Sequence, residues 1–374
     1  MIRVGARRVV TTSAVLEPGW LEVDGARISR VEAGQLDPAE GRILETLIPG
    51  LIDIHVHGGG GASFADGTDE AVLAAVVHHR RRGTTSLLAS LMTASAPALE
   101  VQLAHVASFV ESGVLAGVHL EGPWLSPLRA GAHPPGLLRP PERTEVGRLL
   151  TLARGTVRMV TLAPELAGGL DAVRMIVDHG AVAALGHTDA DYAVAAAALD
   201  AGASHGTHLG NGMRPVHHRE PGVVLALLER DSVVLELIND GVHLHDAVTA
   251  GVIRTAGSHR VALVSDAIPT SGMPDGTYRV GDDDVEIRAG VVRQLRSGSL
   301  AGSNTCLAEN LRRAVQVLGV PLADATVMAT TTPARALQLP DVGRLEAGAM
   351  ADVVALDDDL RVTAVMHQGA WIPR

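Results

Sequence analysis

The chain has 374 residues, of which 47% are hydrophobic and only 2% are aromatic, and its formal net charge is −11. A chain of this length can bury one large core and still carry a smaller appended unit. The acidic balance, the few aromatic rings and the lack of a sustained basic run argue against binding to nucleic acid or to an anionic membrane surface.

The content of cysteine and lysine narrows the chemistry further. The single cysteine, Cys306, cannot form an intrachain disulfide, and the chain contains no lysine. Schiff-base chemistry on lysine and a metal bridge made by a carboxylated lysine are therefore excluded. No apolar stretch has the length of a membrane span, and none follows the N-terminal arginines as in a secretion signal. We therefore expect a cytoplasmic protein.

Both ends of the chain have the pattern of short strands. Residues 1–48 alternate apolar and polar positions around turns such as Asp24-Gly25, and residues 338–374 repeat this style. Neither end is long enough to bury a core by itself. We therefore predict one small β-sandwich domain that is built from both termini.

Between these ends, residues 49–337 alternate apolar runs of strand length with longer segments of helical periodicity. The eight runs are LIPGLIDIHVHG, TTSLLASLM, LAGVHLEGPW, VRMVTLAPE, AVAALGHT, ASHGTHLGN, VVLELINDGVHL and RVALVSDAI. Eight strand–helix units predict an α/β fold of the TIM-like (β/α)8 barrel type, whose functional groups lie at the C-terminal ends of the strands. An open doubly wound sheet is less favoured, because no Gly-rich dinucleotide loop follows the first strand.

Histidines and carboxylates end most of these runs, at positions that meet at one mouth of a barrel. The candidate metal ligands are His55, His57, Glu121, His187 and His208. Each histidine taken alone could be structural, but together they favour a divalent ion, with zinc preferred and iron, cobalt or manganese as alternatives. If two ions bind, Glu121 bridges them, with the first two histidines on one ion and the last two on the other. If one ion binds, its ligands are Glu121, His187 and His208.

Asp266 ends the eighth run and is the best candidate for a general base. A divalent ion lowers the pKa of its bound water from roughly 16 to about 7. A carboxylate within hydrogen-bond reach can take that proton and later give it to a leaving amine. The alternative roles of Asp266 are an additional metal ligand or a cap of the following turn.

The ordered motifs resemble those of the N-acetylglucosamine-6-phosphate deacetylases, a branch of the amidohydrolase superfamily. The matching segments span nearly the whole chain and are PGLIDIHVHGGGG, HLEGPW followed by GAH, LGHTDA, THLGNGM, INDGVHL, LVSDAIPTSGMPDGTY, LAGSNTCL, ATTTPARAL and GRLEAGAMADVV. The resemblance implies a metal-dependent barrel enzyme, commonly a homodimer. Its implied reaction is the hydrolysis of N-acetyl-D-glucosamine 6-phosphate to D-glucosamine 6-phosphate and acetate.

The resemblance also implies roles for single residues. Glu121, His187 and His208 match the family's metal ligands, and Asp266 matches its catalytic acid and base. His133 matches the residue that contacts the acetamide carbonyl, where a fixed donor stabilises a developing oxyanion. The implied substrate contacts are Ala132, His133, Asn211, Gly212, Arg219, Asp240, His243, Leu300, Ala301 and Gly302. Arg219 is implied to act at the substrate site of the other subunit of a dimer.

One segment departs from the family pattern. Relatives more often have THxFNAM where this chain has THLGNGM, which predicts a smaller pocket wall near the sugar. The galactosamine epimer, or another cyclic or linear amide, is therefore an alternative substrate. A non-catalytic metal-binding sensor of sugar phosphates is the alternative from another class. We predict that the remaining histidines, among them His78 and His79, are solvated.

Overall fold

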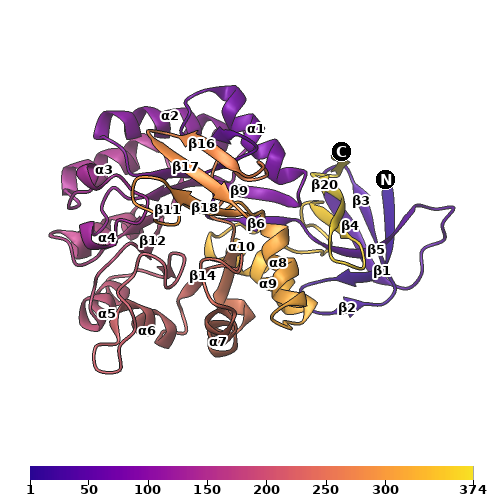
Figure 1. Ribbon diagram of the computed structural model, residues 1–374. Coiled ribbons are helices and arrows are strands. Elements are labelled where there is room, and N and C mark those ends of the chain that lie inside the picture. The colour runs from indigo at the N-terminus through magenta and orange to yellow at the C-terminus, as the bar shows by residue number, and fades with distance from the viewer. Residues whose placement is uncertain (374) are drawn as a thin grey trace. The chain divides into compact units, whose positions relative to one another are not determined.

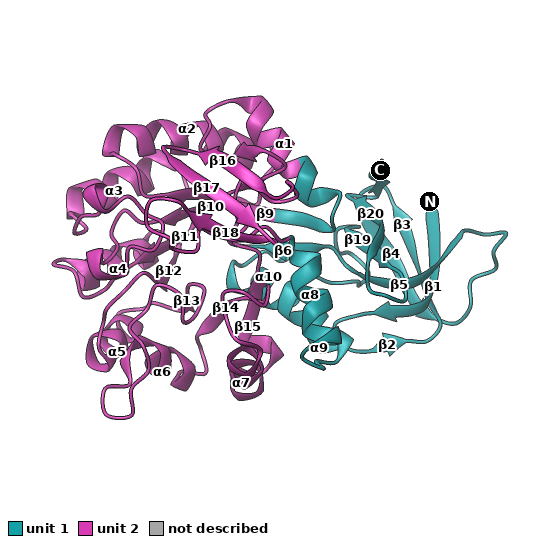
Figure 2. Ribbon diagram, in the orientation of Figure 1, with its two compact units in different colours: residues 1–53, 77–86, 306–374 teal, residues 54–76, 87–305 magenta. Residues whose placement is uncertain are grey.

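The computed structural model describes residues 1–373, and the chain divides into two compact units (Figure 2). One unit contains residues 1–53, 77–86 and the chain from 306 onward, and the other contains residues 54–76 and 87–305. The domain limits expected after residues 48 and 337 remain a prediction.

Strands from both ends of the chain form one sheet in the first unit. Its strands are β1 Ile2–Val10, β2 Val15–Leu16, β3 Gly19–Asp24, β4 Arg27–Ala33, β5 Arg42–Pro49, β19 Val353–Leu356, β20 Val362–His367 and β21 Ala370–Trp371. They follow the order β21-β20-β19-β5-β1-β3-β4, and β2 pairs with β1. Side chains of β3 alternate between buried and partly exposed, as in a sheet with one covered face. The prediction of a β domain built from both termini is confirmed.

A second eight-stranded sheet contains the eight apolar runs of the sequence. Its strands are β6 Leu51–Asp53, β9 Thr84–Met92, β10 Gly117–Glu121, β11 Val157–Leu162, β12 Val182–Leu185, β13 His205–Gly206, β14 Val234–Ile238 and β15 Val261–Val264, and neighbours in this chain order also pair in space. Residues of β10, β14 and β15 are all buried, because both faces of such a sheet are covered. Beyond the strand ends, Val56 bridges in parallel to Ala267, and the amide of His57 donates to the carbonyl of Ala267 over 2.8 Å. This contact joins the first and last segments, and the predicted TIM-like barrel is confirmed.

A helix follows each barrel strand in the chain (Figure 1). These helices are α1 Asp69–Arg80, α2 Ala96–Glu111, α3 Arg143–Leu152, α4 Gly169–Asp178, α5 Tyr192–Asp200, α6 Gly222–Glu229, α7 Asp246–Ala256 and α8 Leu307–Gln316, and the helices α9 Leu322–Ala329 and α10 Thr331–Ala336 come after them. In α4, Ala172, Val173 and Ile176 are buried, at the spacing of an amphipathic helix. No helix among residues 1–373 is both long and apolar enough to cross a lipid bilayer.

Two small antiparallel sheets interrupt the strand–helix alternation. β7 (Gly58–Gly59) pairs with β8 (Ala62–Ser63), and β17 (Asp283–Arg288) pairs with both β16 (Gly276–Val280) and β18 (Val291–Gln294). Apolar side chains of β17 and β18 pack with Ile268 and Ala301 in a separate buried cluster. The three-stranded sheet therefore forms a wall beside the end of β15.

Candidate metal centre and active site

Three of the predicted site residues lie in strained backbone just beyond barrel strands. His187, His208 and Asp266 each lie two residues after the end of their strand, with φ angles of 46°, 29° and 49°. Residues other than glycine rarely adopt this left-handed region, and such strain is typical of functional sites. The surrounding barrel therefore holds the backbone of these three residues in a conformation that a free loop would not keep.

Glu121 and two histidines form one group of potential metal ligands. Oε1 of Glu121 lies 3.1 Å from Nε2 of His187 and 3.1 Å from Nε2 of His208, and the two Nε2 atoms are 3.0 Å apart. Nδ1 of His187 donates to the carbonyl oxygen of Arg129 over 2.8 Å. Because a carbonyl only accepts hydrogen bonds, this contact leaves Nε2 of His187 with a lone pair directed at the group.

A second group combines His55, His57 and Asp266. The Nε2 atoms of the two histidines are 3.2 Å apart, and Oδ1 of Asp266 lies 3.5 Å from the first and 3.3 Å from the second. The remaining oxygen of Glu121, Oε2, lies 3.2 Å from Nε2 of His57. Glu121 therefore contacts both groups, which is the arrangement that the two-ion alternative requires.

In the second group, as for His187 in the first, hydrogen bonds at Nδ1 direct Nε2 of each histidine toward the other potential ligands. Nδ1 of His57 donates to the carbonyl of Ser90 over 3.2 Å, and Nδ1 of His55 donates to Oε2 of Glu236 over 3.0 Å. In the neutral rings that bind a metal ion, both Nε2 lone pairs then face the carboxylates and each other. Buried nitrogen and oxygen donors that converge in this way fit a divalent ion of the Zn²⁺ type. The residues present can therefore hold a metal ion.

The charges of this cluster shift the pKa values of its members. Burial lowers the pKa of His57, but Asp266 and Glu121 outweigh burial and raise that pKa to about 9. Burial raises the pKa of Asp266, but the imidazoles of His55 and His57 outweigh it and lower the pKa to about 2. Asp266 is consequently an ionised carboxylate at neutral pH and can accept a proton.

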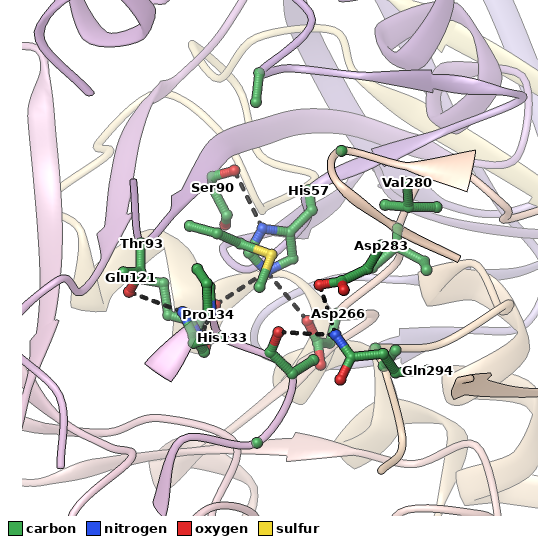
Figure 3. Close-up of a pocket in the computed structure, with 18 of the residues that line it drawn as sticks. His57, Ser90, Thr93, Glu121, His133, Pro134, Asp266, Val280, Asp283 and Gln294 are labelled. Atoms are coloured by element: carbon green, nitrogen blue, oxygen red, sulfur yellow. Dashed lines mark hydrogen bonds and ion pairs between the residues drawn. The ribbon is translucent and has the colours of Figure 1, made fainter. Parts of the chain in front are cut away.

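His133 lines a pocket of about 600 Å³, near Thr93 and Glu121 (Figure 3). Its Nδ1 lies 2.9 Å from Oγ1 of Thr93, and its Nε2 lies 3.4 Å from Oε2 of Glu121. Burial lowers the pKa of His133 to about 4, so the imidazole is neutral at neutral pH. The pocket brings together many predicted site residues, namely His57, Glu121, Ala132, His133, His187, His208, Asn211, Gly212, His243, Asp266, Leu300, Ala301 and Gly302.

Three predicted residues do not line this pocket. His55 is completely buried behind it. Asp240 accepts a hydrogen bond from Nδ1 of His243 over 2.7 Å, so it contacts a lining residue without reaching the pocket surface. Arg219 is exposed, and its guanidinium contacts the neighbouring His218. The structure therefore does not bring Arg219 into the pocket of its own chain.

Sequence reasoning missed the groups that orient the candidate ligands. Ser90, Thr93 and Glu236 contact His57, His133 and His55, respectively. Ser90 acts here through its backbone carbonyl, and a threonine just after a strand, such as Thr93, gives no signal by itself. Glu236 did give one, because it is a lone carboxylate in the otherwise apolar run VVLELI.

The prediction that His78 and His79 are solvated is wrong. The two residues are 8% and 0% exposed and lie at the C-terminal end of α1. Nε2 of His78 lies 3.5 Å from the buried sulfur of Cys306. Alanine and valine occur on several faces of α1, so the helix has no clear apolar stripe. The sequence therefore did not indicate which face of α1 is buried.

Comparison with known proteins places the site in a family. A model of the amidohydrolase family matches residues 46–372. The chain belongs to this family. A solved structure of an aspartate-to-alanine mutant of N-acetyl-D-glucosamine-6-phosphate deacetylase from Mycobacterium smegmatis, in complex with N-acetyl-D-glucosamine-6-phosphate, is 46% identical in sequence. The alignment has a TM-score of 0.96 and covers 99% of this chain and 98% of that chain.

Two curated relatives in the amidohydrolase family differ in the sugar that they are named for. The N-acetylgalactosamine-6-phosphate deacetylase of Escherichia coli O157:H7 is 38% identical over 97% of this chain and 97% of its own length. The N-acetylglucosamine-6-phosphate deacetylase of Vibrio furnissii is 38% identical over 87% of this chain and 82% of its own length. The family resemblance found in the sequence, and with it the prediction of a hydrolytic enzyme, is confirmed.

Proposed function

We propose that the protein hydrolyses the acetamide of N-acetyl-D-glucosamine 6-phosphate to D-glucosamine 6-phosphate and acetate. The observation that carries this proposal is the meeting of Asp266, His133 and the candidate ligands at one pocket. The similarity to the M. smegmatis enzyme bound to that phosphosugar names the substrate.

In the proposed reaction, Glu121, His187 and His208 would hold one divalent ion, and His55 and His57, together with the nearby carboxylates of Asp266 and Glu121, would hold a second one. Zinc is the preferred ion, with iron, cobalt or manganese as alternatives. Bound metal supplies Lewis-acid polarisation of the acetamide and lowers the pKa of the attacking water.

Asp266 and His133 have complementary roles in this proposal. The ionised Asp266 carboxylate takes a proton from the attacking water and returns it to the leaving amine. His133 faces a carboxylate through Nε2, so Nε2 carries the proton of the neutral ring and Nδ1 accepts from the Thr93 hydroxyl. The Nε2–H group can then donate to the acetamide oxygen as negative charge develops there.

The phosphate group needs a cation that the pocket of one chain does not provide. Among the described residues that line the pocket, none is an arginine, and Asp282 and Asp283 add negative charge to its wall. Arg219 is exposed on the same unit and free of ion pairs with carboxylates among the described residues. We therefore propose a homodimer in which the partner subunit's Arg219 binds the phosphate.

N-acetyl-D-galactosamine 6-phosphate is a second candidate substrate. The E. coli relative named for that sugar is as similar in sequence as the V. furnissii relative named for the glucosamine form. The two sugars differ at one hydroxyl group, so a comparison of kcat/KM for both phosphosugars decides between them. The unphosphorylated sugars are the controls for recognition of the phosphate.

The first test is acetate release from these sugars by metal-analysed protein, with Asp266→Asn as the matched variant. We expect wild-type turnover of a phosphosugar and a loss of kcat by at least about 100-fold in the variant, because a neutral amide cannot take the proton. Circular dichroism checks that the variant folds. Wild-type turnover by Asp266→Asn would contradict the role of Asp266, and a protein that binds metal and phosphosugar without acetate release would instead be a sensor.

A further inference from the structure

Glu236 lies behind the metal centre on strand β14 and is completely buried. Its Oε2 accepts two hydrogen bonds, from Nδ1 of His55 over 3.0 Å and from the amide of His208 over 3.1 Å. Its Oε1 has no hydrogen-bond partner among residues 1–373. A buried carboxylate with only two donors is costly unless a positive charge lies close to it.

Among the described residues, His55 is the imidazole that forms an ion pair with Glu236, and the other nitrogen of His55 belongs to the second ligand group. The hydrogen bond to Glu236 fixes the proton of His55 on Nδ1, and it leaves the Nε2 lone pair 3.5 Å from both Oε1 of Glu121 and Oδ1 of Asp266. A carboxylate behind a histidine also makes that histidine a more basic ligand. A divalent ion bound to Nε2 of His55 would therefore supply the positive charge that balances the Glu236 carboxylate.

The balance of charge also favours a second cation at the His55 and His57 site. Glu121, Asp266 and Glu236 are three buried carboxylates, and none of them pairs with an arginine in the part of the chain that the structure describes. One divalent ion would leave this cluster of carboxylates and neutral imidazoles negative, whereas two would more than balance it. Removing the charge of Glu236 should therefore weaken the binding of one of the two ions.

We propose that Glu236 is a positioning residue for the second ion: it orients His55 and supplies the buried negative charge that lets the His55 and His57 site hold a divalent cation. This role deepens the proposed metal-dependent function and rests on it. We expect the ion held by Glu121, His187 and His208 to depend less on the charge of Glu236, because Glu236 contacts only the backbone amide of one of these ligands, His208.

The test is a titration of metal-free protein with Co²⁺, followed by elemental analysis and by the d–d absorption of the bound ion. We expect two ions per chain in the wild type. In Glu236→Gln, whose amide oxygen can still accept both hydrogen bonds, the weaker dissociation constant should rise about 10- to 100-fold, as for other groups that orient a ligand. The tighter dissociation constant should change by less than about threefold.

A double-mutant cycle separates a role through His55 from a general structural effect. His55→Asn should remove the second ion, and adding Glu236→Gln to it should cause no further loss of metal binding, because the two changes act on one ligand. Wild-type binding of two ions by Glu236→Gln, or equal weakening of both ions, would contradict the proposal. Equal weakening would indicate that Glu236 acts through the amide of His208.

A measurement on the wild type does not depend on the folding of any variant at position 236. In metal-loaded protein the Nδ1–H proton of His55 should give a downfield, exchange-protected NMR signal that is absent from His55→Asn. Absence of such a signal from the wild type would also overturn the proposal. Because Co²⁺ binding and NMR do not require turnover, failure of acetate release would contradict the proposed function and leave this role of Glu236 to be judged by its own results.

Discussion

Two buried histidines outside the proposed metal centre, His205 and His78, affect how the stability of the protein depends on pH. Within the described part of the chain, neither ring nitrogen of His205 has a hydrogen-bond partner, and burial lowers the pKa of His205 to about 4. Burial, with smaller contributions from His79 and Arg82, lowers the pKa of His78 to about 3. Both imidazoles are therefore neutral in the folded protein at pH values where an exposed histidine takes up a proton.

This difference predicts a loss of stability in mild acid. The pKa of histidine in the unfolded chain is about 6.5, so below that pH the unfolded state binds protons that the folded state does not. Stability that is fully present above pH 6.5 should decrease as the pH falls toward the folded pKa values, which are about 4 for His205 and about 3 for His78. Calorimetry should show this loss of stability as a Tm that decreases as the pH is lowered from about 7.5 to about 5.5. His205→Asn should show a shallower decrease than the wild type, and parallel curves would contradict the assignment.

At the scale of an element, helix α5 shows how a loop that carries a ligand is fixed. The helix begins directly after the segment that contains His187, and the side chain of Asp191 accepts a hydrogen bond from the amide of Val194 over 2.8 Å. An aspartate at this position also interacts favourably with the positive end of the helix dipole. Asp191 therefore fixes the point where the loop ends and the helix starts.

We expect Asp191→Ala to lower the free energy of unfolding by about 1 kcal/mol. In a protein of this size the change corresponds to a decrease in Tm of roughly 1–2 °C. The matched control is Glu142→Ala at the start of α3, where the side chain makes no capping hydrogen bond, and this variant should leave Tm unchanged. Equal Tm values for both variants would show that the hydrogen bond of Asp191 contributes nothing measurable.

At the scale of the whole molecule, the distribution of charge bears on the proposed homodimer. The protein is acidic overall and contains no lysine, so arginine is the only permanently charged cation that could hold a phosphate. The pocket of a single chain has carboxylates in its wall and no arginine among its described residues. A dimer that shares Arg219 would resolve this mismatch.

Mixing two variants with complementary defects tests that arrangement at a phosphosugar concentration well below the raised KM of Arg219→Ala, where each variant alone has little activity. Arg219→Ala should raise KM for the phosphosugar and leave the unphosphorylated sugar unaffected, whereas Asp266→Asn lacks the proton acceptor. When the two variants are dissociated and reassembled together, activity should return to about a quarter of the wild-type value, because about half of the random dimers are mixed and each has one complete site. Without recovery, Arg219 would serve its own chain or no site at all, and unchanged KM in Arg219→Ala would contradict its role.

The sequence by itself determined the fold and predicted most of the candidate metal centre, because both depend on local patterns. Apolar runs followed by helical periodicity specify a barrel, and a barrel brings the ends of its strands together whatever the details of packing. His55 and His57 point to one side because side chains alternate along an extended chain. The ends of the third, fifth and sixth strands accordingly placed Glu121, His187 and His208 within 3.1 Å of one another.

Only the tertiary structure decided which side chains stand behind those ligands and which predicted residues stay outside the pocket. Glu236 and His55 are 181 residues apart, and Thr93 and His133 are 40 apart, so no local pattern couples them. The same holds for the burial of His78 and His79 and for the absence of Arg219 from its own pocket. Contacts of this kind depend on how distant segments pack in three dimensions, and periodicity along the chain carries no record of that packing.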